Sequence, residues 1–273
     1  MAMSALPASS PLRLYWPNCS FFMFSWVYGS STGLCCWFQY GTGFNWRASS
    51  LGGNIVAPVT IAGHIVLVGS TSGAVYALDA ATAEILWTRR LTAGVEAKIA
   101  ADDRACFIAG IDQSVWAFDL SNGRVLWQHF TSSPLRNPPS RIGDGLYVQI
   151  PGEGLVSFNP APRDKPDGEV RWRSNAAGDV VSASGNRLYA WEARSRTMSV
   201  VDAASGRVIH ESRIPNAVQL QFTAPVDGDM LLMGADGRVE SLAPSRRPAP
   251  AAPAAPATSA VEASASASAA PSR

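Results

Sequence analysis

Few groups of residues have the types and spacing of a reactive site. Gly29-Ser30-Ser31-Thr32-Gly33 fits the G-x-S-x-G pattern of a serine nucleophile, whose chemistry needs a helix directly after the turn. No helical pattern follows here, so the segment is not expected to carry a nucleophile. Cys35 and Cys36 are adjacent, whereas zinc ligands are usually separated by two to four residues. A zinc site is therefore not expected either.

The histidine and aspartate residues suggest structural roles. His64, His129 and His210 have no acidic residue or cysteine at the spacing of a metal site. The pairs Asp102-Asp103 and Asp227-Gly228-Asp229 could bind a hard cation, but both lie where strands are expected to turn, and aspartate is favoured in turns for other reasons. No phosphate loop, nucleotide fingerprint or HExxH motif is present. We predict no catalytic residue, no cofactor-binding residue and no metal ligand.

The charge balance excludes one class of partner. The chain has 273 residues, 22 of them Lys or Arg and 21 Asp or Glu, which leaves a net charge of +1. Such a chain has no basic field with which to bind nucleic acid. With 47% apolar residues it can bury a substantial core.

Composition divides the chain into three parts. Residues 1–42 carry one charge and many aromatic side chains, and we interpret them as a leader, through which the chain could associate with a membrane, or as an irregular extension. Residues 43–244 form the predicted folded domain. Residues 245–273 contain 12 Ala, 5 Pro and 6 Ser among 29 residues and are predicted to be disordered.

An internal repeat organises the middle part. The stretch from Ile65 to Trp87 reads as three short strands joined by two tight turns, and the stretch from Cys106 to Trp127 repeats it. Weaker copies end at Trp172 and His210, and a fifth ends at Leu242. The positions 46, 87, 127, 172 and 210 are separated by 41, 40, 45 and 38 residues. That period is the length of one four-stranded propeller blade.

The turn residues have a physical reason to recur. Asp79, Asp119 and Asp202 each precede the end of their repeat by eight residues and can accept hydrogen bonds from the following turn. Gly123 and Gly206 supply the positive φ that this reversal needs. The first copy has alanine there, so its turn must be built differently or be strained. The third copy has five extra residues, and its loop 159–169 is predicted to protrude.

Residues 69–87 and 117–127 resemble the signature of the PQQ-like β-propeller repeat family, and the likeness extends over about residues 43–244. The resemblance implies an all-β PQQ-like β-propeller of about five four-stranded blades. In this family the recurrent tryptophan docks one blade onto the next. By match that role falls on Trp46, Trp87, Trp127 and Trp172, and His210 departs from the pattern.

The ring has a candidate for closure. Gly43-Phe44-Asn45-Trp46 looks like an outer strand without a blade of its own, so it could pair into the fifth sheet. Since family members usually have seven or eight blades, the alternative is an incomplete arc of a larger propeller.

The resemblance also implies a function. Quinoprotein dehydrogenases of this superfamily bind PQQ and Ca²⁺ in larger propellers, and no residue here matches those ligands. Cys35-Cys36 is similar to their vicinal disulfide but precedes the first predicted blade. Other relatives are non-catalytic propellers of the outer-membrane β-barrel assembly machinery. We therefore predict a scaffold without enzymatic activity or cofactor that binds protein partners in the bacterial cell envelope or periplasm; the alternative is a PQQ-dependent dehydrogenase or PQQ-binding protein.

A basic cluster marks one candidate surface for such a partner. Five arginines gather along the predicted third blade: Arg136, Arg141, Arg163, Arg171 and Arg173. With the protruding loop they could form a partner-binding edge, of which Arg163, Arg171 and Arg173 are the principal residues. The alternative is a solvated blade edge.

Overall fold

The structure, a computed structural model, describes residues 19–22, 25–39, 43–48 and 51–242. These residues form strands joined by turns and irregular segments, and no helix that could cross a membrane occurs among them. All of the described residues belong to one compact unit. The tail predicted from residue 245 lies outside the described residues.

The described strands form six antiparallel sheets, each built from strands that follow one another in the chain. The first sheet contains β1 (Cys19–Phe22), β2 (Ser25–Gly29), β3 (Cys35–Gln39) and β4 (Gly43–Ala48). The second contains β5 (Thr60–Ala62), β6 (Ile65–Gly69), β7 (Ala74–Asp79) and β8 (Ile85–Arg90). The third contains β9 (Ala100–Ala101), β10 (Ala105–Gly110), β11 (Ser114–Asp119) and β12 (Val125–Phe130).

The remaining three sheets continue the same order. The fourth contains β13 (Ser140–Ile142), β14 (Gly145–Ile150), β15 (Gly154–Asn159) and β16 (Glu169–Ser174). The fifth contains β17 (Asp179–Ser184), β18 (Arg187–Glu192), β19 (Thr197–Asp202) and β20 (Val208–Arg213). The sixth contains β21 (Ala217–Phe222), β22 (Met230–Gly234) and β23 (Val239–Leu242).

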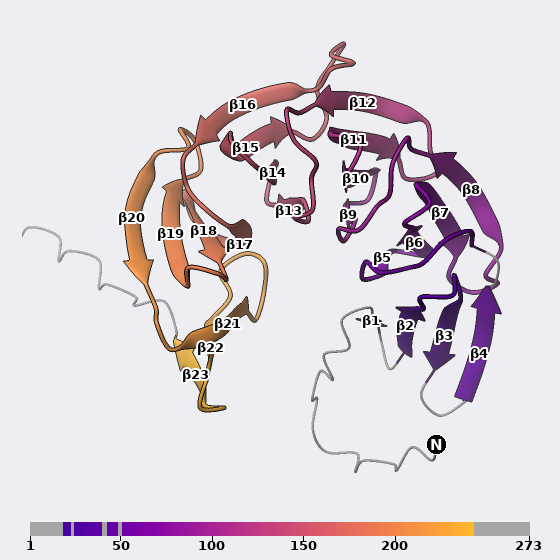
Figure 1. Cartoon of the computed structure of the whole chain (residues 1–273), viewed down its shortest axis with the longest axis horizontal. Coiled ribbons are helices and arrows are strands. Elements are labelled where there is room, and N and C mark those ends of the chain that lie inside the picture. Colours follow the sequence, from indigo (N-terminus) through magenta and orange to yellow (C-terminus); the bar gives the residue numbers. More distant parts are fainter. Residues whose placement is uncertain (1–18, 23–24, 40–42, 49–50, 243–273) are drawn as a thin grey trace, which may run out of the picture. The chain divides into compact units, whose positions relative to one another are not determined.

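Each sheet is one propeller blade. The first strands of consecutive sheets contact each other, β1 with β5, β5 with β9, β9 with β13, β13 with β17 and β17 with β21. The fourth strands β8, β12, β16 and β20 lie on the outside (Figure 1), and we call them the outer rim. The prediction of an all-β propeller of four-stranded blades is confirmed, with three strands described in the last sheet.

The core lies between neighbouring sheets. Strands β6 and β10 are buried along their whole length, because both of their faces pack against other sheets. One cluster joins Leu67, Val75 and Trp87 of the second sheet to Ile108 and Phe118 of the third. A second cluster joins the third sheet to the fourth in the same way. Stability therefore comes from contacts between blades.

The N-terminal boundary and the closing strand differ from their predictions. Strand β4 pairs with β3, with Trp37 opposite Trp46, so the predicted pairing of this strand with the last sheet is wrong. The predicted boundary at residue 42 falls inside the first sheet. The physical reason is proximity: β1, β2 and β3 precede β4 in the chain, and antiparallel strands joined by short turns pair first. Six sheets are therefore described, where the sequence predicted about five.

Candidate interaction surface on the outer rim

Three tryptophans of the outer rim anchor their blades to the following blade. Trp87, Trp127 and Trp172 are at most 9% exposed. Each indole N–H donates to a backbone carbonyl of the next sheet: Trp87 to Leu120 at 2.9 Å, Trp127 to Pro160 at 3.2 Å and Trp172 to Ala203 at 2.9 Å. Each acceptor directly follows the last residue of a third strand. A buried indole needs such a partner, which fixes where the next blade sits. The side chain of Trp46 lies outside the described residues.

The turn glycines touch these indole rings. Gly123 and Gly206 have φ of 67° and 74°. A Cβ added at Gly123 would lie 2.6 Å from the Trp87 ring, and one added at Gly206 would lie 2.5 Å from the Trp172 ring. Glycine is therefore required for the backbone conformation and for the blade contact. Sequence reasoning found the first requirement and missed the second. In the first copy Ala83 adopts φ of 64°, a strained conformation for alanine.

The aspartates bind the backbone of their turns. Oδ1 of Asp119 accepts from the backbone N–H of Ser121 at 3.0 Å and from its hydroxyl at 2.6 Å. These bonds, that from the hydroxyl first, hold the pKa of Asp119 below its usual value. Asp79 and Asp202 accept equivalent bonds in their own turns. All three side chains stabilise turns.

The extra residues of the fourth blade form a protruding loop on this rim. We call residues 160–168 the rim loop; it connects β15 with β16. Besides the Trp127 bond, the backbone N–H of Gln128 donates to the Pro166 carbonyl at 2.8 Å, and Nδ1 of His129 lies 3.1 Å from the Asp167 carbonyl. The loop projects beyond the sheets (Figure 1), and successive residues of β12 hold its base.

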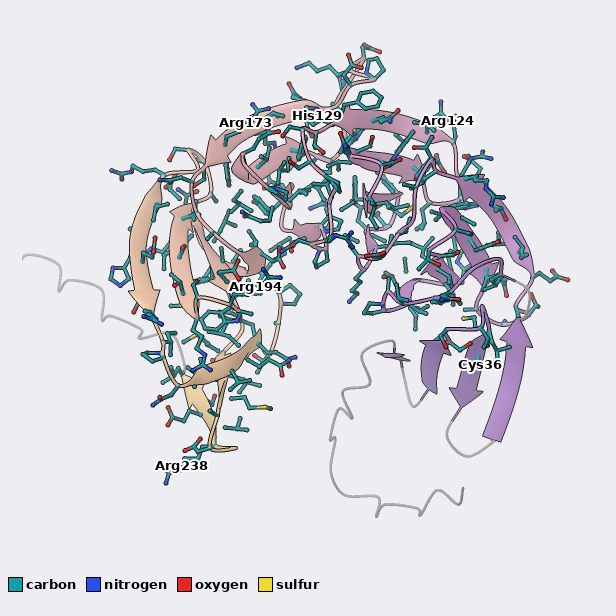
Figure 2. The ribbon with its side chains drawn as sticks, in the orientation of Figure 1. Cys36, Arg124, His129, Arg173, Arg194 and Arg238 are labelled. Carbon is teal, nitrogen blue, oxygen red and sulfur yellow. The ribbon has the colours of Figure 1, made fainter. Side chains whose placement is uncertain are left out.

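The three principal arginines lie on this loop and on the strand that follows it. Arg163 is an exposed residue of the rim loop, and Arg171 and Arg173 are exposed residues of β16 on either side of buried Trp172. Their partners are acidic residues of the same blade: Arg171 pairs with Asp144 and Arg173 with Glu153, both at 3.3 Å. Such exposed pairs contribute little to stability, so the arginines can exchange these partners for others. Figure 2 places Arg173, His129 and Arg124 along the outer strands.

The other two arginines of the cluster lie elsewhere. Arg136 pairs with Glu96, and Arg141 pairs with Asp102 at 2.9 Å, so both link the third blade to the fourth. Neither belongs to β16 or to the rim loop. The structure therefore divides the predicted cluster into rim residues and interblade residues.

The remaining candidate groups are not brought together. Cys35 and Cys36 are consecutive residues of β3, both buried and free, and burial together with the charge of Cys36 raises the pKa of Cys35 to about 12. Ser31 lies in the turn between two strands. His64 and His210 are exposed, one in a turn and one on β20. Within the described part of the chain no three His, Cys, Asp or Glu side chains could hold a metal ion.

Comparison with known families identifies these blades. The family model for outer membrane protein assembly factor BamB matches residues 38–162 and 163–271. The chain belongs to this family of PQQ-like propellers. The match covers most of the chain and includes the outer rim with its three anchoring tryptophans.

Individual relatives are distant. The chain is 27% identical over 174 residues to protein Rv3035 of Mycobacterium tuberculosis, covering 58% of this chain and 42% of that protein. It is 23% identical over 186 residues to the outer membrane protein assembly factor BamB of Francisella salina, covering 64% of this chain and 35% of that protein. The matched region thus spans less than half the length of either relative.

Solved structures agree on the fold. The computationally designed protein Ika8 aligns with a TM-score of 0.69 at 16% identity, covering 83% of this chain and 70% of that one. BamB from Moraxella catarrhalis aligns with a TM-score of 0.62 at 19% identity, covering 80% of this chain and 70% of that one. These likenesses concern the propeller architecture alone.

Proposed function

We propose that this chain is a non-catalytic scaffold that binds a protein partner through the rim loop and the exposed arginines of β16. The observation that carries the proposal is the anchoring of the rim loop by Trp127, Gln128 and His129 of the neighbouring blade. An anchored, protruding loop with an exposed arginine is preorganised for binding and loses little conformational freedom when a partner docks.

Family membership supports the same role and suggests a location. One relative is named an outer membrane protein assembly factor. We extend this to the present chain as a place in the bacterial cell envelope and an activity that consists of holding other proteins. The exposed guanidinium groups suit a partner surface rich in carboxylates, with which arginine forms paired hydrogen bonds.

Charge reversal tests this surface. We expect the double variant Arg163→Glu, Arg171→Glu to reduce recovery of the partner at least about fivefold, because repulsion replaces attraction at the contact. Recovery is measured by affinity purification of the tagged full chain from its own host, followed by quantitative mass spectrometry. The matched control, Arg207→Glu with Arg213→Glu, removes the same charge from the fifth blade. Equal recovery with wild type and both variants would refute the proposal.

We further propose that the scaffold works without PQQ or Ca²⁺. The support is that, among the described residues, no three His, Cys, Asp or Glu side chains are grouped so that they could hold a metal ion. Titration of the folded chain with PQQ, with and without Ca²⁺, should leave tryptophan emission unchanged apart from inner-filter absorption. The nine tryptophans make emission a sensitive readout. Saturable quenching that depends on Ca²⁺ would contradict this proposal and favour the quinoprotein alternative.

A further inference from the structure

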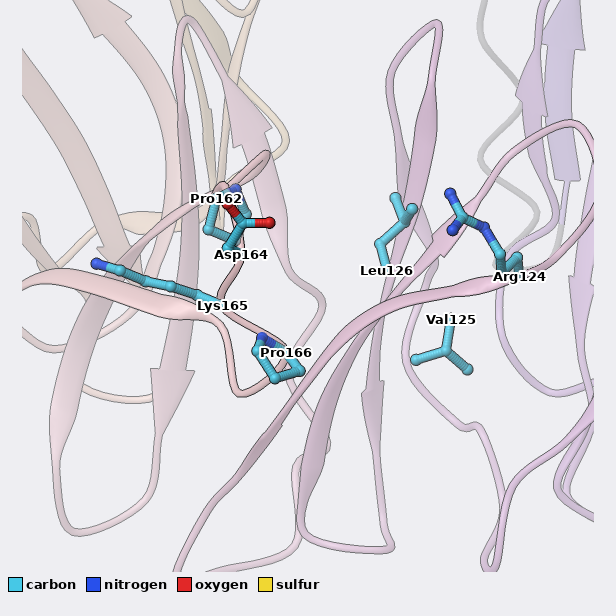
Figure 3. Close-up of a pocket in the computed structure, with 7 residues that line it drawn as sticks. All are labelled: Arg124, Val125, Leu126, Pro162, Asp164, Lys165 and Pro166. Carbon is cyan, nitrogen blue, oxygen red and sulfur yellow. The ribbon is translucent and has the colours of Figure 1, made fainter.

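A hollow opens between the rim loop and the start of β12. Its volume is about 430 Å³, within the range of small binding sites. We call it the rim hollow. Figure 3 shows its two walls, one from the residues at the start of β12 and the other from the rim loop. Its lining residues are Arg124, Val125, Leu126, Pro162, Asp164, Lys165 and Pro166.

The lining of the rim hollow is mainly polar, but each wall also contributes apolar groups. Val125 is 46% exposed although it begins a strand, and Leu126 beside it is half-buried. Pro162 and Pro166 face them from the loop (Figure 3). Binding is favoured when an apolar side chain of a ligand covers such exposed aliphatic and proline surface, because apolar area is removed from water.

The two walls carry opposite charges. Arg124 extends from the wall formed by β12, and Asp164 extends from the loop toward it (Figure 3). No side-chain hydrogen bond or ion pair of Arg124 or Asp164 occurs within the described part of the chain, although the charge of Arg124 also acts on Asp119 in the same turn. Lys165 turns away from the hollow and pairs with Glu169. Both charged groups at the hollow are therefore available to a ligand.

The shape of the rim hollow is fixed in advance. The carbonyl of Pro166 accepts from the backbone N–H of Gln128 at 2.8 Å, which holds one wall against the other. In the neighbouring third blade the equivalent turn has only five residues between Asp119 and Val125, whereas the fourth blade has nine between Asn159 and Glu169. The extra residues of the rim loop therefore form the second wall of the hollow. The outer strand β8 has no such wall, because the loop opposite it is the short turn of the third blade.

We propose that the rim hollow binds an extended segment of a partner protein. This segment places an apolar side chain between Val125 and Pro166, a carboxylate at Arg124 and a cationic group at Asp164. The inference rests on the proposed scaffold function and adds a second contact to it, with a chemistry different from that of the arginines on β16. Because the two walls carry opposite charges, a complementary segment must have an acidic group at one end and a basic group at the other.

The test uses a defined probe, the fluorescein-labelled peptide Glu-Ser-Leu-Phe-Ser-Lys, and fluorescence anisotropy with the full chain. We expect saturable binding that Val125→Asp weakens at least about tenfold, because a carboxylate in the apolar contact loses its hydration. The matched control is Ile85→Asp, since Ile85 begins β8 and is 53% exposed but has no long loop opposite. Equal weakening by both substitutions would overturn the proposal, and so would a lack of saturation at about 1 mM of the chain.

Charge variants identify which group reads which end of the peptide. Arg124→Glu should weaken the probe about fivefold but leave a peptide with Gln in place of Glu unchanged. Asp164→Asn should weaken the probe but leave a peptide with Gln in place of Lys unchanged; asparagine also tolerates the φ of 53° at this position. Arg207→Glu, which directly precedes β20, is the matched charge control. If each protein variant weakened the probe and the matching charge-neutral peptide by the same factor, the assignment of the two walls would be overturned.

The partner recovery experiment separates this inference from the proposed function. Suppose that the partner is lost with the Arg163 and Arg171 double variant but not with Val125→Asp. The proposed scaffold function would then be supported, and the proposal that the rim hollow binds the partner would be refuted. Loss with neither variant would refute the scaffold surface itself.

Discussion

Replacing Trp127 by alanine should lower the free energy of unfolding by about 3–5 kcal/mol, the cost observed for deleting large buried aromatic side chains. Trp127 is 1% exposed, and its ring centroid lies 5.7 Å from that of Phe158 and 6.1 Å from that of Phe107. The substitution leaves a cavity between the third and fourth blades and removes the donor to the Pro160 carbonyl. Urea denaturation of the full chain, followed by circular dichroism, measures the loss.

A second variant separates the contribution of the indole N–H from that of the ring, and a control substitution measures the cost of losing an exposed side chain. Trp127→Phe keeps most of the ring but loses the indole N–H, so it should cost less than the alanine variant by about 2 kcal/mol. Ile85→Ala, at a side chain that is 53% exposed, should cost about 0.5 kcal/mol or less. A loss for Trp127→Ala as small as that for Ile85→Ala would show that the indole does not join the blades.

The same residue connects stability with the proposed function. Trp127 holds the rim loop at Pro160, and the neighbouring Gln128 holds it at Pro166. The blade core and the candidate surface therefore share one strand, β12. We infer that the inserted residues of the rim loop add a recognition element to the contact by which Trp127 anchors the third blade to the fourth.

The features that sequence reasoning found are local. Asp119, Gly123 and Trp127 recur because each satisfies a requirement within a few residues, namely a capped turn, a positive φ and an anchored outer strand. These requirements bring back the aspartate in the second, third and fifth blades, the glycine in the third and fifth, and the tryptophan in the second, third and fourth. The period and the propeller fold follow from them.

The first blade shows where this reasoning stops. Strands β1, β2 and β3 carry neither the aspartate nor the glycine signature of the later blades, so composition alone predicts a leader or an irregular extension. One signal was present: Trp46 lies 41 residues before Trp87, and an outer strand at that position requires three strands before it. The short run of β-branched and aromatic residues Trp26-Val27-Tyr28 is typical of a strand and supplies one of them.

Contacts between distant segments could not be read from the sequence. The amide of Asn137 donates to Asp179 at 2.9 Å across 42 residues, from the link before β13 to the start of β17. Asn137 occupies the place in its link that Ala97 occupies in the previous one. The residues next to Asn137 in the sequence do not indicate that its side chain forms a polar contact, whereas the equivalent Ala97 forms an apolar one. The charged and polar pairs between blades thus depend on the assembled fold.

The pair of Asn137 and Asp179 should make the stability of the chain depend on pH. Burial first, and then the charge of Glu192, raise the pKa of Asp179 from 3.8 to about 6 against the opposing hydrogen bond from Asn137. Folding therefore favours the protonated form. The wild-type chain should lose stability as the pH rises from about 4 to about 6, because the unfolded chain releases this proton more readily than the folded chain does.

Asp179→Asn should remove this titration. The asparagine keeps a hydrogen-bonding partner for Asn137 but carries no charge, so the variant should be more stable than wild type by about 1–2 kcal/mol at pH 7.5 and equally stable near pH 4. Thermal unfolding at both pH values measures the difference, with the exposed Asp103→Asn as the control for loss of one surface charge. The same gain at pH 4 and pH 7.5 would show that Asp179 is not the group that titrates. A gain confined to high pH would mean that the contact between the fourth and fifth blades weakens when this carboxylate ionises.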